Sequence, residues 1–189
     1  MADRPTVPRI PPLEPADADP AQVELLAAAT VPGGGASNIF ATLVRAPGLF
    51  RKWLPFGGKL LNGKVAARER ELAILRVGWL CRSEYEWGQH VAIGRLVGVS
   101  DDDIERIKAG PEAEGWTPTE AAILRAADEL HGDACITDGT WAELAGVFDE
   151  AQLIELVTVI GHYHLVSFAL NSFGVQREPG VEGFDGGAS

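Results

Sequence analysis

The apolar segment at residues 150–173 constrains the fold most. It reads EAQLIELVTVIGHYHLVSFALNSF and is apolar enough to be the central buried helix of a domain. Its most apolar part is interrupted by Glu155, His162 and His164, and no stretch of the chain reaches the roughly 20 uninterrupted apolar residues that a membrane span needs. We therefore predict a soluble domain that buries this helix.

The rest of the chain has the features of helices and none of a sheet. No segment shows sustained period-two alternation bounded by turn residues. Strong helix starts are present at Asp19-Pro20, at Ser100 with three following aspartates, and at the capping box from Thr117 to Glu120. These signals predict an all-α, single-domain helical bundle over residues 20–175. The predicted helices are 20 to just before Pro32 and Gly33–Gly35, 37–46, 47–61, 66–80, 85–97, a short helix after Ser100, 121–130, 138–148 and 150–173.

The two ends of the chain differ from this pattern. The prolines between Pro5 and Pro20 deny the start of the chain regular backbone hydrogen bonding, so residues 1–19 are predicted to be an extended arm. The other end, EPGVEGFDGGAS, is rich in glycine, and residues 176–189 are predicted to be a flexible, frayed tail.

Composition excludes several classes of partner. The net charge of −11 would repel a nucleic-acid backbone or an anionic membrane, so neither is expected to bind. The N-terminus lacks the basic start and apolar middle of a secretory signal, so a cytoplasmic location is expected. In that compartment Cys81 and Cys135 indicate buried thiols rather than a disulfide. No metal-ligand spacing and no phosphate-binding glycine loop is present, so we expect neither metal nor cofactor.

Candidate chemistry lies between Glu71 and His90. Glu86 and His90 are four residues apart and share a helix face, where the carboxylate can orient the imidazole of a general base. Glu71 lies on a mostly apolar stripe, so burial would raise the pKa of its carboxyl group. Glu84 adds a third carboxylate. The alternative is structural, because Glu–His pairs are commonly solvated and Glu71 could instead bridge Arg68 or Arg70 on the surface.

A second polar feature lies in the apolar segment 150–173. Ile160, His164, Ser167 and Asn171 share one stripe of this predicted helix, and buried polar groups of this kind need partners. The stripe is consistent with the wall of a pocket opposite His90 or with a hydrogen-bonded seam in an oligomer. His131 lies near a predicted helix C-terminus, where an imidazole interacts favourably with the helix dipole, so we assign it no further role.

Three segments of the chain resemble one known family. RERELAILRVGWLCRSEYEWGQHV, AAILRAADELHGDACITDGTWAEL and FDEAQLIELVTVIGHYHLVSFALNSFGV resemble the carboxymuconolactone decarboxylase family, which includes the alkyl hydroperoxide reductase D peroxidases. Together they cover roughly Leu60 to Val175. The resemblance implies an all-helical fold that assembles as homotrimers or hexamers, with the site near the subunit contacts.

The two branches of that family place different residues in the site. In the peroxidase branch the C-x-x-C cysteines fall on Ser83 and Glu86, and a proton-relay glutamate falls on Glu71. This chain keeps the glutamate and His90 but has neither cysteine, which argues against dithiol chemistry. The decarboxylase branch also has carboxylates at the positions of Glu84 and Glu86.

The resemblance and the motif together predict a cofactor-independent lyase acting on a small organic acid or lactone. His90 would be the general acid or base, oriented by Glu86, and Glu71 or Glu84 would shuttle the proton. Removing the imidazole is expected to abolish turnover and to leave assembly and thermal stability near normal. The residues expected to bind substrate or an oxyanion are Ser83, Tyr85, His164 and Asn171.

Two alternatives remain open at the level of sequence. One is a peroxidase of the alkyl hydroperoxide reductase D type, which the missing cysteine pair disfavours. The other is a non-enzymatic oligomeric protein that binds a ligand in the same pocket.

Overall fold

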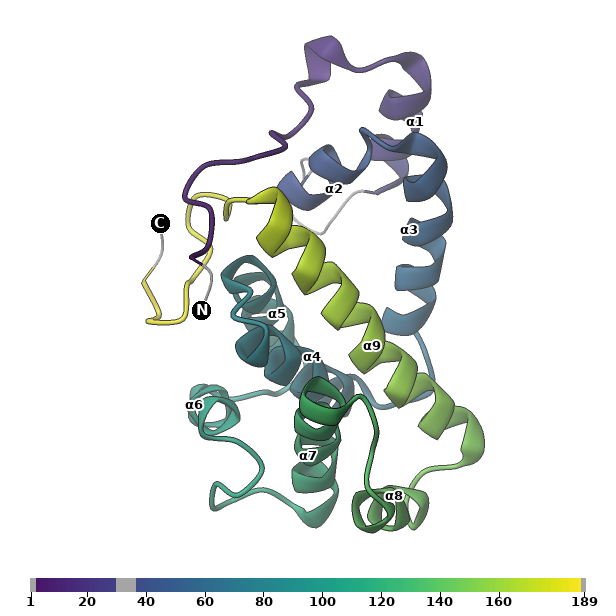
Figure 1. Ribbon diagram of the computed structural model, residues 1–189, viewed down its shortest axis with the longest axis vertical. Coiled ribbons are helices and arrows are strands. Elements are labelled where there is room, and N and C mark those ends of the chain that lie inside the picture. Colours follow the sequence, from purple (N-terminus) through teal and green to yellow (C-terminus); the bar gives the residue numbers. More distant parts are fainter. Residues whose placement is uncertain (1–2, 30–36, 188–189) are drawn as a thin grey trace.

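The computed structural model describes residues 3–29 and 37–187, and in these residues the protein is all-helical with no strand (Figure 1). The all-α class predicted from the sequence is therefore confirmed. The predicted helix end at Pro32 and Gly33–Gly35 lies outside the described residues. The elements are the 3-10 turn η1 (Pro15–Asp17) and the helices α1 (Pro20–Ala28), α2 (Asn38–Leu43), α3 (Pro47–Leu61), α4 (Ala67–Leu80), α5 (Glu84–Leu96), α6 (Asp101–Ala109), α7 (Pro118–Asp133), α8 (Asp138–Ala145) and α9 (Glu150–Phe173).

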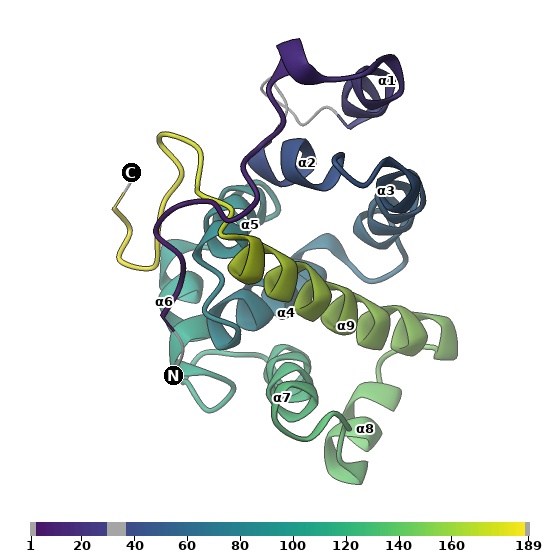
Figure 2. The ribbon, with the colours of Figure 1, turned by 45° about the horizontal axis from the view of Figure 1, so that its top comes forward.

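The most deeply buried helix is α4, which packs against α5, α6, α7 and α9. Every residue of α4 from 70 to 78 is buried. We expected α9 to be the central buried helix, but that position belongs to α4, and α9 is only partly buried. Figure 2 shows α9 running between α3 on one side and α7 and α8 on the other, so part of its surface has no neighbour.

The uncovered side of α9 is apolar. Ile154, Leu165 and Phe168 are each more than half exposed, whereas Leu156, Ile160 and Leu170 are in the core. Among the described residues α9 is the one helix long and apolar enough to cross a membrane, but half of its most apolar stretch is buried in the protein, as in core helices of soluble domains. The high apolar content of this segment therefore identifies the helix without identifying how much of it one protomer covers.

Local capping sets where several helices begin. The side chain of Thr117 accepts a hydrogen bond from the Glu120 N–H, and the Glu120 side chain accepts one from the Thr117 N–H. The same reciprocal arrangement occurs at Ser100 and at Asp149, which begin α6 and α9. At the other end of α9, Gly174 has φ 69°, the left-handed conformation that glycine adopts without strain.

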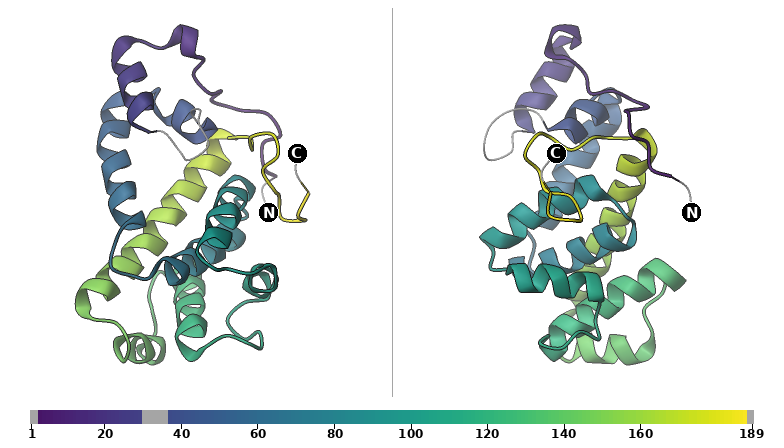
Figure 3. Two further views of the ribbon diagram at one scale, coloured as in Figure 1. Left: turned by 180° about the vertical axis from the view of Figure 1, so that it is seen from behind. Right: turned by 90° about the vertical axis from the view of Figure 1, so that its left-hand side faces the viewer.

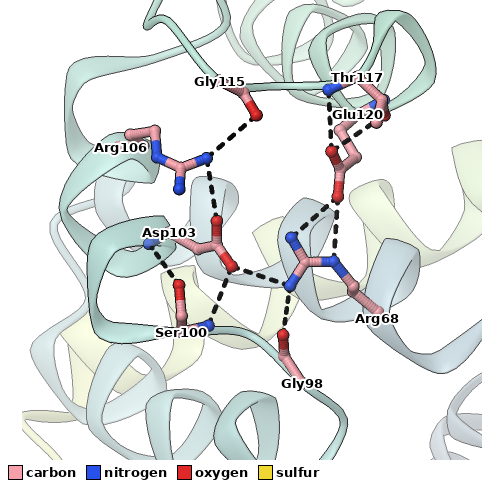
Figure 4. Close-up of polar contacts among 8 residues, drawn as sticks. All are labelled: Arg68, Gly98, Ser100, Asp103, Arg106, Gly115, Thr117 and Glu120. Carbon is pink, nitrogen blue, oxygen red and sulfur yellow. Dashed lines mark hydrogen bonds and ion pairs between the residues drawn. The ribbon is translucent and has the colours of Figure 1, made fainter.

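Arg68 ties three helices together at the start of α4 (Figure 4). Its guanidinium makes ion pairs with Asp103 of α6 at 2.9 Å and with Glu120 of α7 at 2.9 Å. Both carboxylates belong to capping boxes, so one arginine fixes two helix starts. The Arg68 side chain is only 31% exposed, because α6 and α7 cover it.

Both ends of the described chain lie on the side of the molecule where α5 begins (Figures 1 and 3). The N-terminal arm is extended and held to the body, since the N–H of Arg9 donates to the carbonyl of Phe173. The tail differs from the frayed segment that we expected. Phe184 packs against Trp79 and Trp87, and a side chain at Gly88 would collide with the backbone of the tail. Close backbone contact therefore holds the described part of the tail on α5.

Candidate active site

The imidazole of His90 lies between two buried carboxylates. Its Nδ1 is 2.6 Å from Oε2 of Glu71, and its Nε2 is 3.0 Å from Oε1 of Glu86. Glu71 comes from the middle of α4, and Glu86 and His90 lie one turn apart on α5. All three are buried, and Glu71 is fully so. The structure thus brings together the three residues that the sequence pattern singled out first, and the contact between Glu71 and His90 joins α4 to α5.

A fourth charged residue extends this arrangement. The Nε of Arg70 lies 3.6 Å from Oε1 of Glu71, and the Arg70 side chain is itself only 9% exposed. Arg70, Glu71, His90 and Glu86 therefore form a buried row in which positive and negative groups alternate. Neither Arg70 Nε nor Glu71 Oε1 has a direct hydrogen-bond partner among the described residues, and at 3.6 Å their contact leaves them with unused hydrogen-bonding capacity.

The two carboxylates determine the charge of His90. Burial alone would lower the pKa of the imidazole, but the charges and hydrogen bonds of Glu71 and Glu86 outweigh it and raise the pKa of His90 to about 10. At neutral pH His90 is therefore an imidazolium, with one N–H donated to each carboxylate. The sequence left open whether His90 is a general acid or a general base, and the geometry favours the role of acid.

His90 and Glu86 line a small apolar cavity. The cavity has a volume of about 200 Å³ and lies between α2, α3, α5 and α9. Its wall is mainly aromatic and aliphatic, with few polar groups, as in many small-molecule sites. The lining residues are Ser37, Ile39, Phe40, Trp53, Leu54, Gly57, Gly58, Leu61, Tyr85, Glu86, Gln89, His90, Ile93, His162, Tyr163 and Val166.

A second imidazole, which the sequence did not single out for the site, faces the same cavity. The ring of His162 stacks on Trp53 with centroids 5.7 Å apart and makes no hydrogen bond to any residue in the described part of the chain. Burial lowers the pKa of His162, so it is neutral where His90 is charged. Gly57 allows this packing, because a Cβ there would lie 3.3 Å from Nε2 of His162.

Three residues near His90 in sequence are not in contact with the pair formed by Glu86 and His90. Glu84 begins α5 and turns to the tail, with its carboxylate 3.7 Å from Nε of Arg177. Ser83 is fully buried and is not part of the cavity wall. Tyr85 reaches the edge of the cavity, but its hydroxyl donates to Glu178 at 2.7 Å. Glu84 and Glu86 are two residues apart, which rotates their side chains by about 200° around the helix axis and places them on nearly opposite faces of α5.

The polar stripe of α9 does not wall the cavity, contrary to one of our two expectations. His164 contacts His131, and the amide of Asn171 donates to the carbonyl of Cys81 at 2.9 Å. These contacts face α4 and α7, whereas His162, Tyr163 and Val166 form the α9 wall of the cavity. The sequence shows polar residues on two faces of α9, and only packing decides which face meets His90.

Comparison with known structures identifies the fold. An uncharacterised peroxidase-related protein from Ralstonia eutropha with an alkylhydroperoxidase AhpD core superposes with a TM-score of 0.78 at 17% identity, covering 92% of this chain and 94% of that one. A similar protein from a Silicibacter species gives 0.75 at 15% identity, covering 92% and 95%. A variant of the debrominase Bmp8, in complex with 2,3,4-tribromopyrrole, gives 0.77 at 16% identity, covering 93% and 94%. The protein therefore has the AhpD-like all-helical fold.

A comparison with family models agrees with the motifs. Residues 47–129 match the model of the carboxymuconolactone decarboxylase family, which confirms the resemblance that the motifs indicate. This family segment contains Glu71, Glu86 and His90, whereas His162 lies beyond it. A comparison with curated protein sequences gives no match.

Proposed function

We propose that this protein is a cofactor-independent lyase of the carboxymuconolactone decarboxylase type, acting on a small organic acid or lactone. The observation that carries the proposal is the placement of His90, which is held as an imidazolium by Glu71 and Glu86 at the wall of an apolar cavity. General acid–base catalysis needs a proton on a group that substrate can reach, and the Nε2 proton shared with Glu86 is such a proton.

The reaction assigned to this site is protonation at carbon. When the bond between a substrate carbon and its carboxylate breaks, carbon dioxide leaves and the electron pair stays as an enolate. The His90–Glu86 pair then delivers its proton to that carbon, and solvent restores the proton. Glu71 holds the imidazole in place through Nδ1. Neutral His162 faces the same space and can donate an N–H to the enolate oxygen.

Two neighbouring imidazoles with opposite pKa shifts support this assignment. Environments that push apart the pKa values of two titratable groups are typical of acid–base sites. Here the pKa of His90 is raised by the carboxylates and that of His162 is lowered by burial. A solvated structural Glu–His pair would not combine full burial with a shared cavity.

The size of the cavity favours a small substrate. At about 200 Å³ it is below the usual range for drug-sized ligands, which begins at about 300 Å³. The debrominase of the same fold binds a small halogenated ring. Both observations favour a compact ring, such as a lactone carrying a carboxylate.

The test is a comparison of two isosteric variants on the same helix. Glu86→Gln should lower turnover of carboxymuconolactone, or of the best compound in a panel of small lactones and keto acids, by about 100-fold or more. Glu84→Gln is the matched control and should retain activity, because its carboxylate faces the tail. Release of carbon dioxide and solvent deuterium incorporation at carbon, followed by NMR, measure the reaction directly.

Equal activity in the two variants would refute the assignment of the acid. Thiol-dependent turnover of an alkyl hydroperoxide, lost in Cys81→Ser, would favour the peroxidase alternative instead. Binding of a lactone without turnover, in wild type and both variants, would favour a non-enzymatic ligand-binding protein.

A further inference from the structure

A second cluster of chemically active side chains lies away from His90, where α4, α7 and α9 meet. Cys81 ends α4, His131 is in the last turn of α7, and His164 is in the middle of α9. One ligand atom from each residue lies within 4.8 Å of those of the other two. The three helices pack against one another, so the cluster has a rigid frame.

The two imidazoles already face each other through nitrogen atoms. Nδ1 of His131 is 3.0 Å from Nε2 of His164. Nδ1 of His164 lies 2.8 Å from the carbonyl oxygen of Ile160, to which it must donate its proton, and this leaves a lone pair on Nε2. A backbone carbonyl that fixes the tautomer in this way is the usual partner of a metal-binding histidine.

The spacing of the three atoms is close to that of a tetrahedral zinc site. With Zn–N of about 2.05 Å and Zn–S of about 2.3 Å, two nitrogen ligands lie about 3.4 Å apart and nitrogen and sulfur about 3.6 Å apart. The observed N···N distance between His131 and His164 is 3.0 Å, and Sγ of Cys81 is 3.9 Å from Nδ1 of His131. Small rotations of the side chains bring all three to zinc.

The cluster also has room for a fourth ligand. Cys81 and His131 border a cavity of about 440 Å³, which Asn171 and Ser172 also line. Arg4 lies at the same cavity, and its charge suits an anionic fourth ligand such as hydroxide or a carboxylate. Three protein ligands with one open position are the arrangement of zinc sites that bind water or substrate.

We propose that Cys81, His131 and His164 form a zinc-binding site that is independent of the His90 site. The alternative is a simple hydrogen bond in which Nδ1–H of His131 donates to Nε2 of His164. Zinc would replace that bond. The His131 proton would move to Nε2 of its own ring, and the Cys81 thiol would release its proton to solvent as the Zn–S bond forms.

Titration of the full chain, stripped of metal with a chelator, tests the proposal. Cobalt(II) is the probe, because a cobalt–thiolate bond gives a charge-transfer absorption and four-coordinate cobalt has intense visible bands. We expect one cobalt per chain, displaced by one Zn²⁺. Cys81→Ser should abolish the charge-transfer band, and His131→Gln or His164→Gln should weaken binding by at least about 100-fold, since loss of outer partners alone costs about 10- to 100-fold.

Two matched controls should bind cobalt with the same affinity and spectrum as wild type. Cys135→Ser removes the other cysteine, which is exposed, and His162→Gln removes an imidazole two residues from His164 that faces the other cavity. His131 is exposed, so its replacement is not expected to disturb folding. Binding that survives Cys81→Ser with unchanged affinity, or that is lost in Cys135→Ser, would overturn the proposal, as would the absence of any thiolate band.

Discussion

At the scale of single residues, His90 stabilises the fold as well as carrying the proposed chemistry. The imidazolium is the shared partner of two carboxylates that are at most 4% exposed. Its removal would leave Glu71 and Glu86 without their common partner, and breaking a buried pair costs about 3–5 kcal/mol. The expectation that His90 could be removed without loss of stability therefore does not fit the structure, which is why Glu86→Gln is the sharper test of activity.

The raised pKa of His90 predicts how stability depends on pH. The folded pKa is about 10 and the unfolded value is about 6.5, so the folded chain holds an extra proton between these values. The stabilisation that protonated His90 contributes is fully present below about pH 6.5 and is lost as the pH rises through about 10. In that window the contribution of His90 to the free energy of unfolding should fall by about 1.4 kcal/mol for each pH unit.

Urea unfolding of wild type and His90→Gln across this range measures the effect. His90→Gln should be less stable at neutral pH, and the difference between the two proteins should shrink toward pH 10. A difference that is constant with pH would show that His90 is not protonated in the folded protein.

At the scale of elements, Arg68 joins the starts of α6 and α7 to α4. Arg68→Ala should lower the free energy of unfolding by about 1–3 kcal/mol, because Asp103 and Glu120 lose charged hydrogen bonds in a partly buried setting. Burial would raise the pKa of Asp103, but bonds to Arg68 and Ser100 lower it. The stabilisation that wild type gains over Arg68→Ala is therefore present above about pH 3.9, the pKa of Asp103 in the unfolded chain. It is lost as pH falls through the lower pKa of Asp103 in the folded protein.

Arg95→Ala is the matched control for this prediction. Arg95 also pairs with two carboxylates, Asp101 and Glu182, but it is more exposed and Asp101 is 81% exposed. Exposed pairs contribute about 0–1 kcal/mol, so this variant should unfold close to wild type. Equal losses in the two variants would mean that the position of Arg68 at two helix caps has no special effect.

At the scale of the whole molecule, the exposed side of α9 predicts self-association. Ile154, Leu165 and Phe168 are exposed. Leu165 lies 11 residues after Ile154 and Phe168 lies 14 residues after it, which is about three and about four helical turns, so the three side chains share one face of α9. A continuous apolar face of this kind is typical of a surface that another subunit covers. Together with the family resemblance, it leads us to expect a homotrimer or a multiple of three.

Light scattering at micromolar concentration measures this directly. Leu165→Glu combined with Ile154→Glu should give a smaller species, because each places a charge in the proposed contact. Leu96→Glu is the control, since Leu96 is 85% exposed but lies at the end of α5. A wild-type protein that is already monomeric would contradict the prediction.

Most of the helices and the pair of Glu86 and His90 could be predicted from the sequence because their causes are local. A helix begins where a side chain such as Thr117 or Asp149 caps the N–H groups two to three residues ahead. A residue four positions along returns to the same face. These interactions depend only on neighbours in the chain. The burial of Glu71 was also suggested by its apolar stripe, although its bond to His90 needs two helices to pack.

Only the tertiary structure decided which faces of the helices meet. His162 and His164 are two residues apart, yet one faces the cavity of His90 and the other faces Cys81 and His131. Cys81 is 50 residues from His131, and His131 is 33 residues from His164, so no local spacing connects them. The same holds for the most apolar stretch of α9, of which only half is buried. Burial is set by the elements that pack against a face, and these come from distant parts of the chain.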